Sequence, residues 1–351
     1  MCYNEYIIRL FYQYFSPQGL KTNKNLGNSS RLVIEEAQKC GINWKIIPGT
    51  ELVTMTYRGQ EKTYFQQVPT ATTAAAKYIC DNKQITSNLL RQSGISVPLG
   101  YILHREHSKK ELLDIFQALK KPLVVKPSNG ACGENVTLDI FTFEKYLRAV
   151  KLALSYSSEK RAGVMVEEMF MGDEYRILLT RKKVIGVLKR VPANVIGNGQ
   201  DSIEQLICQK NKEDIRGVKG SNRSHLEILI DQNLTEVLHE QNLDLDFIPE
   251  KKQQIFLRRV SNISQGGDAI DFSDLIHQSV KDIALKTIQA IPGLTFAGID
   301  LMSTDISQSQ NKDSYVILEV NTSPGFDIHD QPYVGKNRHA AREFLRLLFD
   351  L

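Results

Sequence analysis

Two successive strands of this chain follow each other without a helix between them, and this feature limits the fold more than any other. The segments 176–179 and 184–188 together predict a β-hairpin, whereas parallel strands need a long crossover connection. Elsewhere strands alternate with amphipathic helices, and strong strands are predicted at 296–302 and 315–320. The hairpin argues against a purely doubly wound parallel sheet, and the whole pattern predicts an α+β fold.

The first 80 residues predict a small mixed domain, and residues 81–351 predict a second, larger one. In the first we expect a helix over 31–39 capped by Ser30, a strand at 44–47 and a hairpin over 51–68. Asp81 is expected to cap a helix that runs to Ser93. Further along we expect a capping box at Ser108, helices over 142–154, 202–210, 279–290 and 338–348, and strands at 123–126, 163–167 and 255–259.

Composition excludes several classes of protein. The 351 residues carry a formal net charge of +4 with basic and acidic residues interleaved, so the chain lacks the basic stripe typical of nucleic-acid-binding proteins. Its five cysteines form no C-x-x-C pair and no zinc-finger spacing, which fits free thiols in a reducing cytoplasm. Polar residues interrupt the first fifteen positions, so we expect neither a signal peptide nor a membrane span.

Three polar residues stand inside otherwise apolar strands predicted near the C-terminus. Glu319 and Asn321 are two residues apart, so they share one face of their strand, and a neighbouring strand can place Asp300 beside them. Two carboxylates and an amide oxygen are hard ligands that suit Mg²⁺ together with its waters and phosphates. The other interpretation is a set of hydrogen bonds at a strand end. Because an unpaired polar group inside a sheet is costly, we favour the metal site.

A lysine and a loop with two glycines form a second candidate site. An apolar strand leads to Lys126, and Gly130 and Gly133 lie in the loop of small residues that follows. Such a loop can bring backbone N–H groups close to phosphate oxygens, while the lysine supplies a positive charge. The loop is not a Walker A sequence, and a plain strand–loop–strand connection is the other interpretation.

Acidic residues around position 170 form a third candidate site. Glu167 and Glu168 end a predicted strand, Met169 and Phe170 form an apolar link, and Glu174 follows. A nucleotide base needs backbone polar groups beside an apolar floor, and a ribose needs a carboxylate acceptor. This spacing permits both contacts, although a solvated acidic turn is the other interpretation.

Basic residues that precede two loops form the remaining candidates. They are Arg258 and Arg259, which precede a loop with Asn262 and the pair Gly266-Gly267, and Lys189 with Arg190, which precede the loop at 192–199. The planar guanidinium group suits a phosphate or a carboxylate. A salt-bridged strand end is the other interpretation, particularly for one of two adjacent arginines.

These segments occur in an order that resembles ATP-grasp ligases. From about Asp81 onward the chain is similar to the ligase half of bifunctional glutamate–cysteine ligase/glutathione synthetases and to the ATP-grasp part of cyanophycin synthetases. The segments that carry the resemblance are Asp81-Asn82-Lys83, Val125-Lys126-Pro127, Val166-Glu167-Glu168, Gly172-Asp173-Glu174-Tyr175-Arg176, Arg190-Val191-Pro192-Ala193-Asn194-Val195, Arg258-Arg259 with Asn262-Ile263-Ser264 and Gly266-Gly267, Gly298-Ile299-Asp300, and Glu319-Val320-Asn321. The resemblance implies an ATP-grasp fold, in which two lobes clamp ATP.

The resemblance also implies a role for each candidate residue. Lys83 and Lys126 would contact ATP phosphates, Gly130 and Gly133 would lie in the loop that closes over them, and Lys189 would also contact the nucleotide. Glu167, Glu168, Met169 and Phe170 would hold adenine, with Glu174 on the ribose. Asp300, Glu319 and Asn321 would hold Mg²⁺ or Mn²⁺. We expect at least one of Arg190, Arg258 and Arg259 to bind the carboxylate being activated, and the loop that begins at Asn262 to face the acyl phosphate.

The reaction implied by the resemblance is ATP-dependent carboxylate–amine ligation through an acyl phosphate. We expect γ-glutamylcysteine and glycine as substrates and glutathione as product, because no Mur-ligase-like domain like that of cyanophycin synthetases follows residue 351. The expected partners are small molecules and, since dimers are common in the superfamily, a second copy of the chain. Another amino-acid or dipeptide ligase, similar to cyanophycin synthetase or D-alanine–D-alanine ligase, stays open, as does a non-catalytic ATP-binding module.

Overall fold

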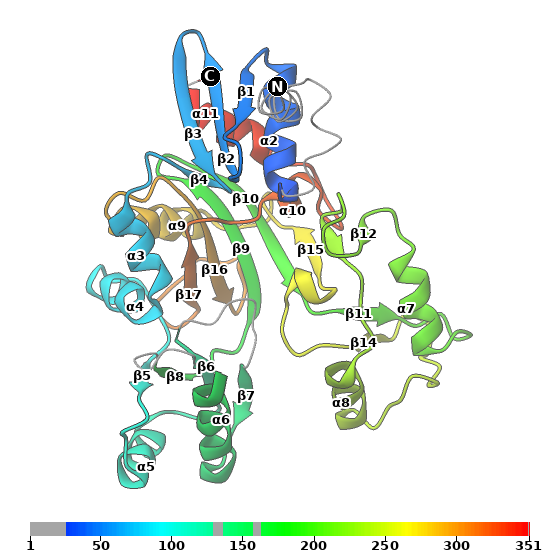
Figure 1. Cartoon of the computed structure of the whole chain (residues 1–351). Helices are drawn as coiled ribbons and strands as arrows, with labels where there is room; N and C mark the ends of the chain where they lie inside the picture. The colour runs from blue at the N-terminus through cyan, green and yellow to red at the C-terminus, as the bar shows by residue number, and fades with distance from the viewer. Residues whose placement is uncertain (1–25, 129–135, 157–162, 350) are drawn as a thin grey trace, which may run out of the picture.

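A central five-stranded sheet organises the molecule, whose computed structural model describes residues 26–128, 136–156, 163–349 and 351 (Figure 1). Its strand order is β15-β10-β9-β16-β17, and every neighbouring pair is antiparallel. The strands are β9 (Asp173–Thr180), β10 (Val184–Val191), β15 (Asp268–Asp271), β16 (Phe296–Ser303) and β17 (Tyr315–Asn321). The predicted hairpin is therefore confirmed as β9–β10, and the fold is the expected mixture of helices and antiparallel sheets.

One face of the central sheet packs on three helices. Alternate residues of β9, such as Tyr175 and Ile177, join the apolar core on this side, while Glu174 and Arg176 point to the other side. The helices are α3 (Ala74–Asp81), α4 (Lys83–Gln92) and α9 (Gln278–Ala290). Asp81 was expected to cap the second of these, but it ends α3, and the side chain of Asn82 accepts the bond from Ile85 N at 3.0 Å instead. Helix α3, which is capped by Thr73, was not anticipated, and its presence shifts the N-cap of α4 from Asp81 to Asn82.

A smaller four-stranded sheet forms a second lobe. Its order is β5-β8-β6-β7, all antiparallel, with β5 (Gly100–Leu103), β6 (Leu123–Pro127), β7 (Thr137–Ile140) and β8 (Val164–Glu168). Helices α5 (Lys109–Ala118) and α6 (Phe143–Tyr156) pack on it around a core of its own. The capping box predicted at Ser108 is confirmed, because Ser108 and Glu111 exchange bonds between side chain and backbone. This lobe carries Lys126 and Glu167.

A subdomain with its own apolar core extends from the edge of the central sheet near β10 and β15. It contains β11 (Asn194–Ile196) paired with β14 (Gln254–Phe256), the helices α7 (Ile203–Asn211) and α8 (Gln232–Glu240), and the short parallel pair β12 (Arg216–Gly217) and β13 (His225–Leu226). The strand expected at 255–259 ends at Phe256, so Arg258 and Arg259 lie in the loop after it. A 3₁₀ turn, η2 (Ile263–Gln265), leads from this loop into β15.

The N-terminal unit shares a core with the C-terminal helix. It consists of α2 (Asn28–Lys39) and a sheet in the order β1-β2-β3-β4, namely β1 (Asn43–Ile46), β2 (Leu52–Tyr57), β3 (Gln60–Phe65) and β4 (Val68–Pro69). Helix α11 (Ala340–Phe349) packs against α2, and α10 (Asp327–Asp330) lies beside them (Figure 1). Ser30 was expected to cap α2, but the helix begins earlier, after Gly27, and the Ser30 hydroxyl donates to Gln66 O at 3.3 Å.

None of the helices in the described residues is both long and apolar enough to cross a membrane.

Candidate functional site

The polar side of the central sheet brings the candidate metal ligands together. Strand register places Asp300 directly between Arg176 of β9 and Glu319 of β17. The Asn321 amide donates to Asp300 Oδ2 at 3.5 Å. We call this surface, formed by Glu174, Arg176, Arg190, Asp300, Glu319 and Asn321, the site face. The period of two along each strand explains why these residues share one side while their apolar neighbours are buried on the other.

Arginines neutralise the carboxylates in the middle of the site face. Asp300 Oδ1 lies 2.7 Å from Arg176 Nε and 3.5 Å from Arg190 Nη1. Arg190 also contacts Glu174 Oε1 at 2.8 Å, and Ser261 donates a hydrogen bond to the other oxygen of Glu174. Burial raises the pKa of Glu174, and the Arg190 guanidinium partly offsets that effect. Arg190 and Glu174 thus belong to one charged network with Asp300.

Lys83 reaches the same surface from the first turn of α4. Its Nζ lies 3.0 Å from Glu319 Oε1, and this pair is partly exposed. A small cavity of about 10 Å³ beside the pair is also lined by Cys80, and it has room for roughly one water molecule. Burial raises the pKa of the Cys80 thiol to about 12, so the thiol stays protonated.

The second lobe supplies a separate lysine–carboxylate pair. Lys126 Nζ lies 2.5 Å from Glu167 Oε2, and both side chains are largely buried. Glu168 Oε1 accepts a bond from Lys120 N at 2.8 Å, and Met169 N donates to Pro122 O at 2.9 Å, so the segment that joins the lobes is anchored. Phe170 follows this segment and is half-buried. Gly130 and Gly133, expected in a phosphate loop, lie outside the described residues.

Lys189 does not join the charged network of the site face. Its Nζ contacts Asp173 Oδ2 at 2.6 Å, at the end of β9. Since both side chains retain appreciable exposure, this pair leaves Lys189 accessible.

The two adjacent arginines have different surroundings. Arg258 is buried and donates to both carboxylate oxygens of Asp231, at 2.7 and 2.8 Å, and to Leu229 O at 2.9 Å. Asp231 in turn caps α8, so Arg258 ties the loop to that helix. Arg259 is 39% exposed, pairs with Glu240, and lies 4.0 Å from Asp139 of the second lobe. These contacts favour a structural role for Arg258. Arg259 lies between the subdomain, which carries Glu240, and the second lobe, which carries Asp139.

Asn262 shapes the loop that follows the arginines. Its Oδ1 accepts bonds from Ser264 N at 3.0 Å and from Ser264 Oγ at 2.9 Å. Gly266 has a φ of +90°, and a Cβ atom on Gly267 would lie 2.7 Å from Val191 O, so both positions need glycine. The loop is a compact turn with little room for side chains.

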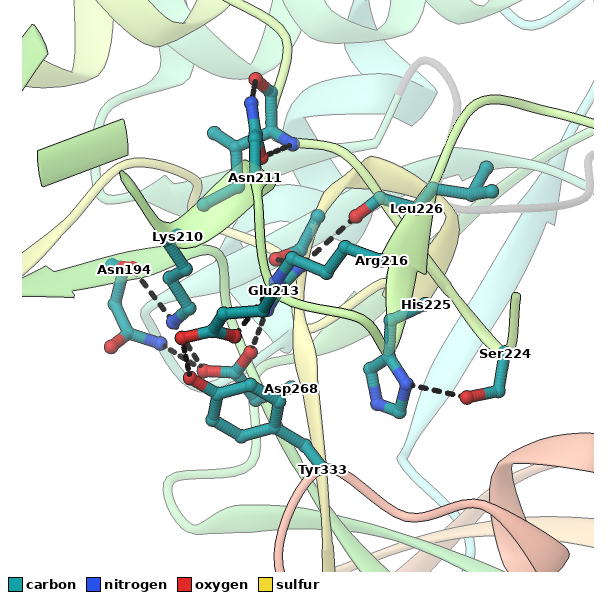
Figure 2. A network of polar contacts seen from close by, with 12 residues as sticks. Asn194, Lys210, Asn211, Glu213, Arg216, Ser224, His225, Leu226, Asp268 and Tyr333 are labelled. Carbon is teal, nitrogen blue, oxygen red and sulfur yellow. Dashed lines mark hydrogen bonds and ion pairs between the residues drawn. The ribbon is translucent and has the colours of Figure 1, made fainter. Parts of the chain in front are cut away.

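A second charged cluster behind this loop was not anticipated. Lys210, Arg216 and Asp268 meet there, together with Asn194 and Tyr333 (Figure 2). Arg216 and Asp268 are 52 residues apart, and no periodic pattern links them. The sequence did not reveal this pairing, because buried charged residues in different elements follow no spacing rule that would pair them.

The donor set fits a hard divalent cation, although it is not a dense acidic cluster. In the described part of the chain, no group of three or more His, Cys, Asp and Glu side chains is placed to hold a metal ion. Asp300 and Glu319 supply carboxylate oxygens on neighbouring strands, and Asn321 can add an amide oxygen. Mg²⁺ commonly takes one or two carboxylates from the protein and completes its shell with water and phosphate, so a set of this size is compatible with that cation.

Comparison with known proteins agrees with this arrangement. Residues 80–198 match the RimK-like ATP-grasp domain family. The chain is 34% identical to the glutathione biosynthesis bifunctional protein of Clostridium perfringens over 331 residues, which cover 93% of this chain and 42% of that protein. It is 31% identical to the cyanophycin synthetase of Trichormus variabilis over 325 residues, which cover 93% of this chain and 35% of that protein.

A solved structure confirms the fold. The bifunctional glutathione synthetase of Pasteurella multocida superposes with a TM-score of 0.72 at 28% sequence identity, covering 93% of this chain and 44% of the other. The chain thus spans less than half the length of these relatives. The chain has the ATP-grasp fold, carries a RimK-like ATP-grasp domain at residues 80–198, and is homologous to bifunctional glutathione biosynthesis proteins and cyanophycin synthetases.

Proposed function

We propose that this protein is an ATP-dependent carboxylate–amine ligase that makes glutathione from γ-glutamylcysteine and glycine, releasing ADP and phosphate. The observation that carries the reaction class is the site face, where Asp300 and Glu319 stand side by side with Lys83 within reach. The substrate assignment rests on the relatives named for glutathione biosynthesis. The name of each relative describes a protein more than twice as long, so the activity of this chain is our inference.

The nucleotide would lie between the two lobes. ATP-grasp ligases use ATP with divalent metal ions, and in this chain Asp300, Glu319 and Asn321 would hold Mg²⁺ or Mn²⁺. The metal would neutralise charge between the β- and γ-phosphates. Lys83 and Lys126 would exchange their carboxylate partners for phosphate oxygens, Glu167 to Phe170 would border adenine, Glu174 would accept from the ribose, and Lys189 would contact the nucleotide. Gly130 and Gly133 would belong to the covering loop.

The residues of the chain position the reactants rather than form covalent bonds with them. A substrate carboxylate oxygen attacks the γ-phosphorus of ATP, and the bond between this phosphorus and the β–γ bridging oxygen breaks. The products of this step are an acyl phosphate and ADP. The amine of the second substrate then attacks the acyl carbon, loses a proton and expels phosphate. At least one of Arg190, Arg258 and Arg259 would orient the carboxylate, and the anchored state of Arg258 favours the other two. Asn262 would support the loop that faces the acyl phosphate.

The setting proposed for this reaction is the cytoplasm, where thiol substrates stay reduced. The proposed partners are small amino acids and dipeptides, with a second copy of the chain as the expected oligomeric partner. We also propose the division into residues 1–80 and 81–351, with α11 packed against the first unit.

Measuring ADP release tests the proposal. Purified protein with ATP and Mg²⁺ should release ADP over many turnovers only when both γ-glutamylcysteine and glycine are present, and chromatography should then detect glutathione in equal amount. Release with arginine or aspartate and a cyanophycin primer instead would favour the second candidate, which the cyanophycin synthetase relatives support. ATP binding without ADP release under any of these conditions would favour a non-catalytic module.

A further inference from the structure

One buried guanidinium holds both residues that flank Gly267. The Arg216 side chain is fully buried, and its Nη1 donates to Gly266 O at 3.0 Å and to Leu226 O at 2.9 Å. Its Nη2 pairs with Asp268 Oδ1. Because the guanidinium group is planar and presents several donors in a fixed geometry, it can set the distance between these two partners.

The other oxygen of Asp268 is held just as firmly. Lys210 Nζ lies 2.7 Å from Asp268 Oδ2, and Asn194 Nδ2 donates to the same oxygen at 2.8 Å. Lys210 also donates to Asn194 O at 2.9 Å, and the ring of Tyr333 lies against both cations (Figure 2). We call Asn194, Lys210, Arg216 and Asp268 the closed network. Three partners, Arg216, Lys210 and Asn194, therefore hold the two oxygens of the Asp268 carboxylate in one position.

A histidine anchors the next residue of β15. His225 is fully buried, and its Nε2 accepts a bond from Ala269 N at 3.2 Å. Burial and the nearby Arg216 lower the pKa of His225 to about 3, so the ring is neutral and carries its proton on Nδ1. Nδ1 faces Ser224 Oγ at 2.9 Å, and that hydroxyl donates to Gln331 O.

Both anchors act on the proposed carboxylate site. Ala269 is the strand partner of Arg190, and Asp268 is the strand partner of Val191, so fixing β15 also fixes the backbone of Arg190. Backbone bonds and the Asn262 side chain hold the loop together internally, but Gly266 and Gly267 supply no side chains that tie it to its surroundings, and glycine gains the most freedom when a turn loosens. Buried ion pairs add little net stability, since desolvation offsets their attraction, and in some proteins they serve to select one geometry.

We infer that Arg216 and Asp268 are positioning residues, which clamp the loop 262–267 and Arg190 in the arrangement that receives the carboxylate substrate. This inference rests on the proposed ligase function. Neither residue is placed to touch a reactant. Each acts through the backbone that it holds. Loss of the clamp should therefore raise the KM for the carboxylate substrate and leave the KM for ATP nearly unchanged.

The replacement Arg216→Lys tests the clamp with the charge retained. A lysine can pair with Asp268 but lacks the planar fork that spans Asp268, Gly266 O and Leu226 O together, so the loop should loosen. The matched control is Arg338→Lys, because Arg338 pairs with Asp271 at the opposite end of the same strand and is likewise mostly buried. Both variants should melt at a lower temperature. Only Arg216→Lys should raise the KM for γ-glutamylcysteine, by about tenfold or more, with the KM for ATP within twofold of wild type.

Hydrogen exchange provides a readout that does not need turnover. The amides of Gly266 and Gly267 donate to Ile263 O and Asn262 O, so their exchange reports the loop directly. Exchange there should accelerate at least about tenfold in Arg216→Lys and stay within twofold of wild type in Arg338→Lys. Unchanged exchange in Arg216→Lys overturns the clamp, even if the protein proves to catalyse another reaction.

The outcomes separate the clamp from the proposed function. Faster loop exchange without any ADP release in wild type would uphold the clamp geometry and reject the ligase. Equal KM changes in both variants, or a lower melting temperature with unchanged KM in Arg216→Lys, would reduce the clamp to a stabilising contact. If Arg216→Lys does not fold, Lys210→Met replaces it, since Asp268 then keeps Arg216 and Asn194, and a smaller shift in the same direction is expected.

Discussion

The Lys83–Glu319 pair at the edge of the site face and the closed network contain the same kinds of side chain but differ in their exposure and in the number of their partners. On the site face, Lys83 and Glu319 form a one-to-one pair whose side chains are 12% and 33% exposed. In the closed network, Arg216 and Asp268 are 0% and 5% exposed, and each has at least three polar contacts. One set of charges faces the space where a ligand would bind, and the other is sealed behind the loop.

This difference determines what each set of charges can do. A partly exposed ion pair contributes little to stability. Its lysine can therefore leave the carboxylate for a phosphate, and its carboxylate can leave the lysine for a metal ion, at a small cost in free energy. A sealed pair cannot lose one partner without leaving an uncompensated buried charge. The comparison predicts that substitutions in the Lys83–Glu319 pair impair chemistry, whereas those in the closed network first impair the fold.

The largest effect is expected for Asp268→Asn. The variant takes away the buried carboxylate that Lys210 and Arg216 share, and the partly exposed Glu213, 3.8 Å from Arg216 Nε, is a weaker substitute. Breaking such a buried pair typically costs about 3–5 kcal/mol. Native-state hydrogen exchange of the subdomain at 193–257 measures the loss. The matched substitution on the site face, Glu319→Gln, should lower the free energy of unfolding by at most about 1 kcal/mol. Equal losses in the two variants would contradict the distinction between exchangeable and sealed charges.

Glu319→Gln should instead have the largest effect on turnover. The variant keeps the shape of the side chain but removes charge from the proposed metal site, so ADP release should fall at least ~100-fold. Steady-state kinetics over a range of Mg²⁺ and Mn²⁺ concentrations checks this. Turnover like that of wild type would remove Glu319 from the metal site.

The two adjacent arginines sharpen the comparison within a single loop. Arg258→Lys should lose bonds to Asp231 and Leu229 O, and since hydrogen bonds to charged groups contribute about 1.5–3 kcal/mol, stability should fall while single-turnover ADP formation persists. Arg259→Lys should slow ADP formation with ATP binding unchanged within a few fold. The melting temperature and single-turnover rate of each variant decide the matter, and the reverse pattern would assign the carboxylate to Arg258.

Stability should also depend on pH through a buried histidine. His225 has a folded-state pKa of about 3 against an ordinary value of 6.5, so the unfolded chain binds one more proton between these values. Stability is therefore fully present above about pH 6.5 and declines as the pH falls toward 3, by up to about 1.4 kcal/mol per pH unit. Thermal melts between pH 7.5 and 4.5 should show a shallower decline for His225→Gln than for wild type.

An exposed histidine supplies the control for this measurement. His239 lies on the surface of α8, so His239→Gln should leave the pH dependence of stability as it is in wild type. His329 is also fully buried, and burial lowers its pKa to about 3, so part of the acid sensitivity should remain in His225→Gln. A wild-type slope in His225→Gln would mean that this ring is not held neutral.

Local patterns in the sequence were sufficient to predict most of the central sheet. Short strand-type segments predicted β9, β10, β16 and β17, and the period of two along a strand placed Glu319 and Asn321 on one face because successive side chains point to opposite sides. The capping box at Ser108 was predicted for a similar reason, since its two partners are three residues apart. These features depend on neighbours in the chain, so the chain alone reveals them.

Other features depended on contacts between distant segments. Asn82 rather than Asp81 caps α4 because α3 ends immediately before it, and α11 packs on α2 although some 300 residues separate them. Arg258 fell outside β14 because Asp231 on α8 holds it in a loop. No local periodicity encodes such partners.

By itself the sequence determined the strand pattern, the order of the charged segments and the pair Glu319 and Asn321, because each follows from spacing along one element. Only the tertiary structure decided which charges are exposed to a ligand and which are sealed. Lys83 meets Glu319 at a partly open surface, whereas Arg216 meets Asp268 in the interior. The two ion pairs differ in exposure because exposure depends on the layers that pack around each pair, and those layers come from all parts of the chain.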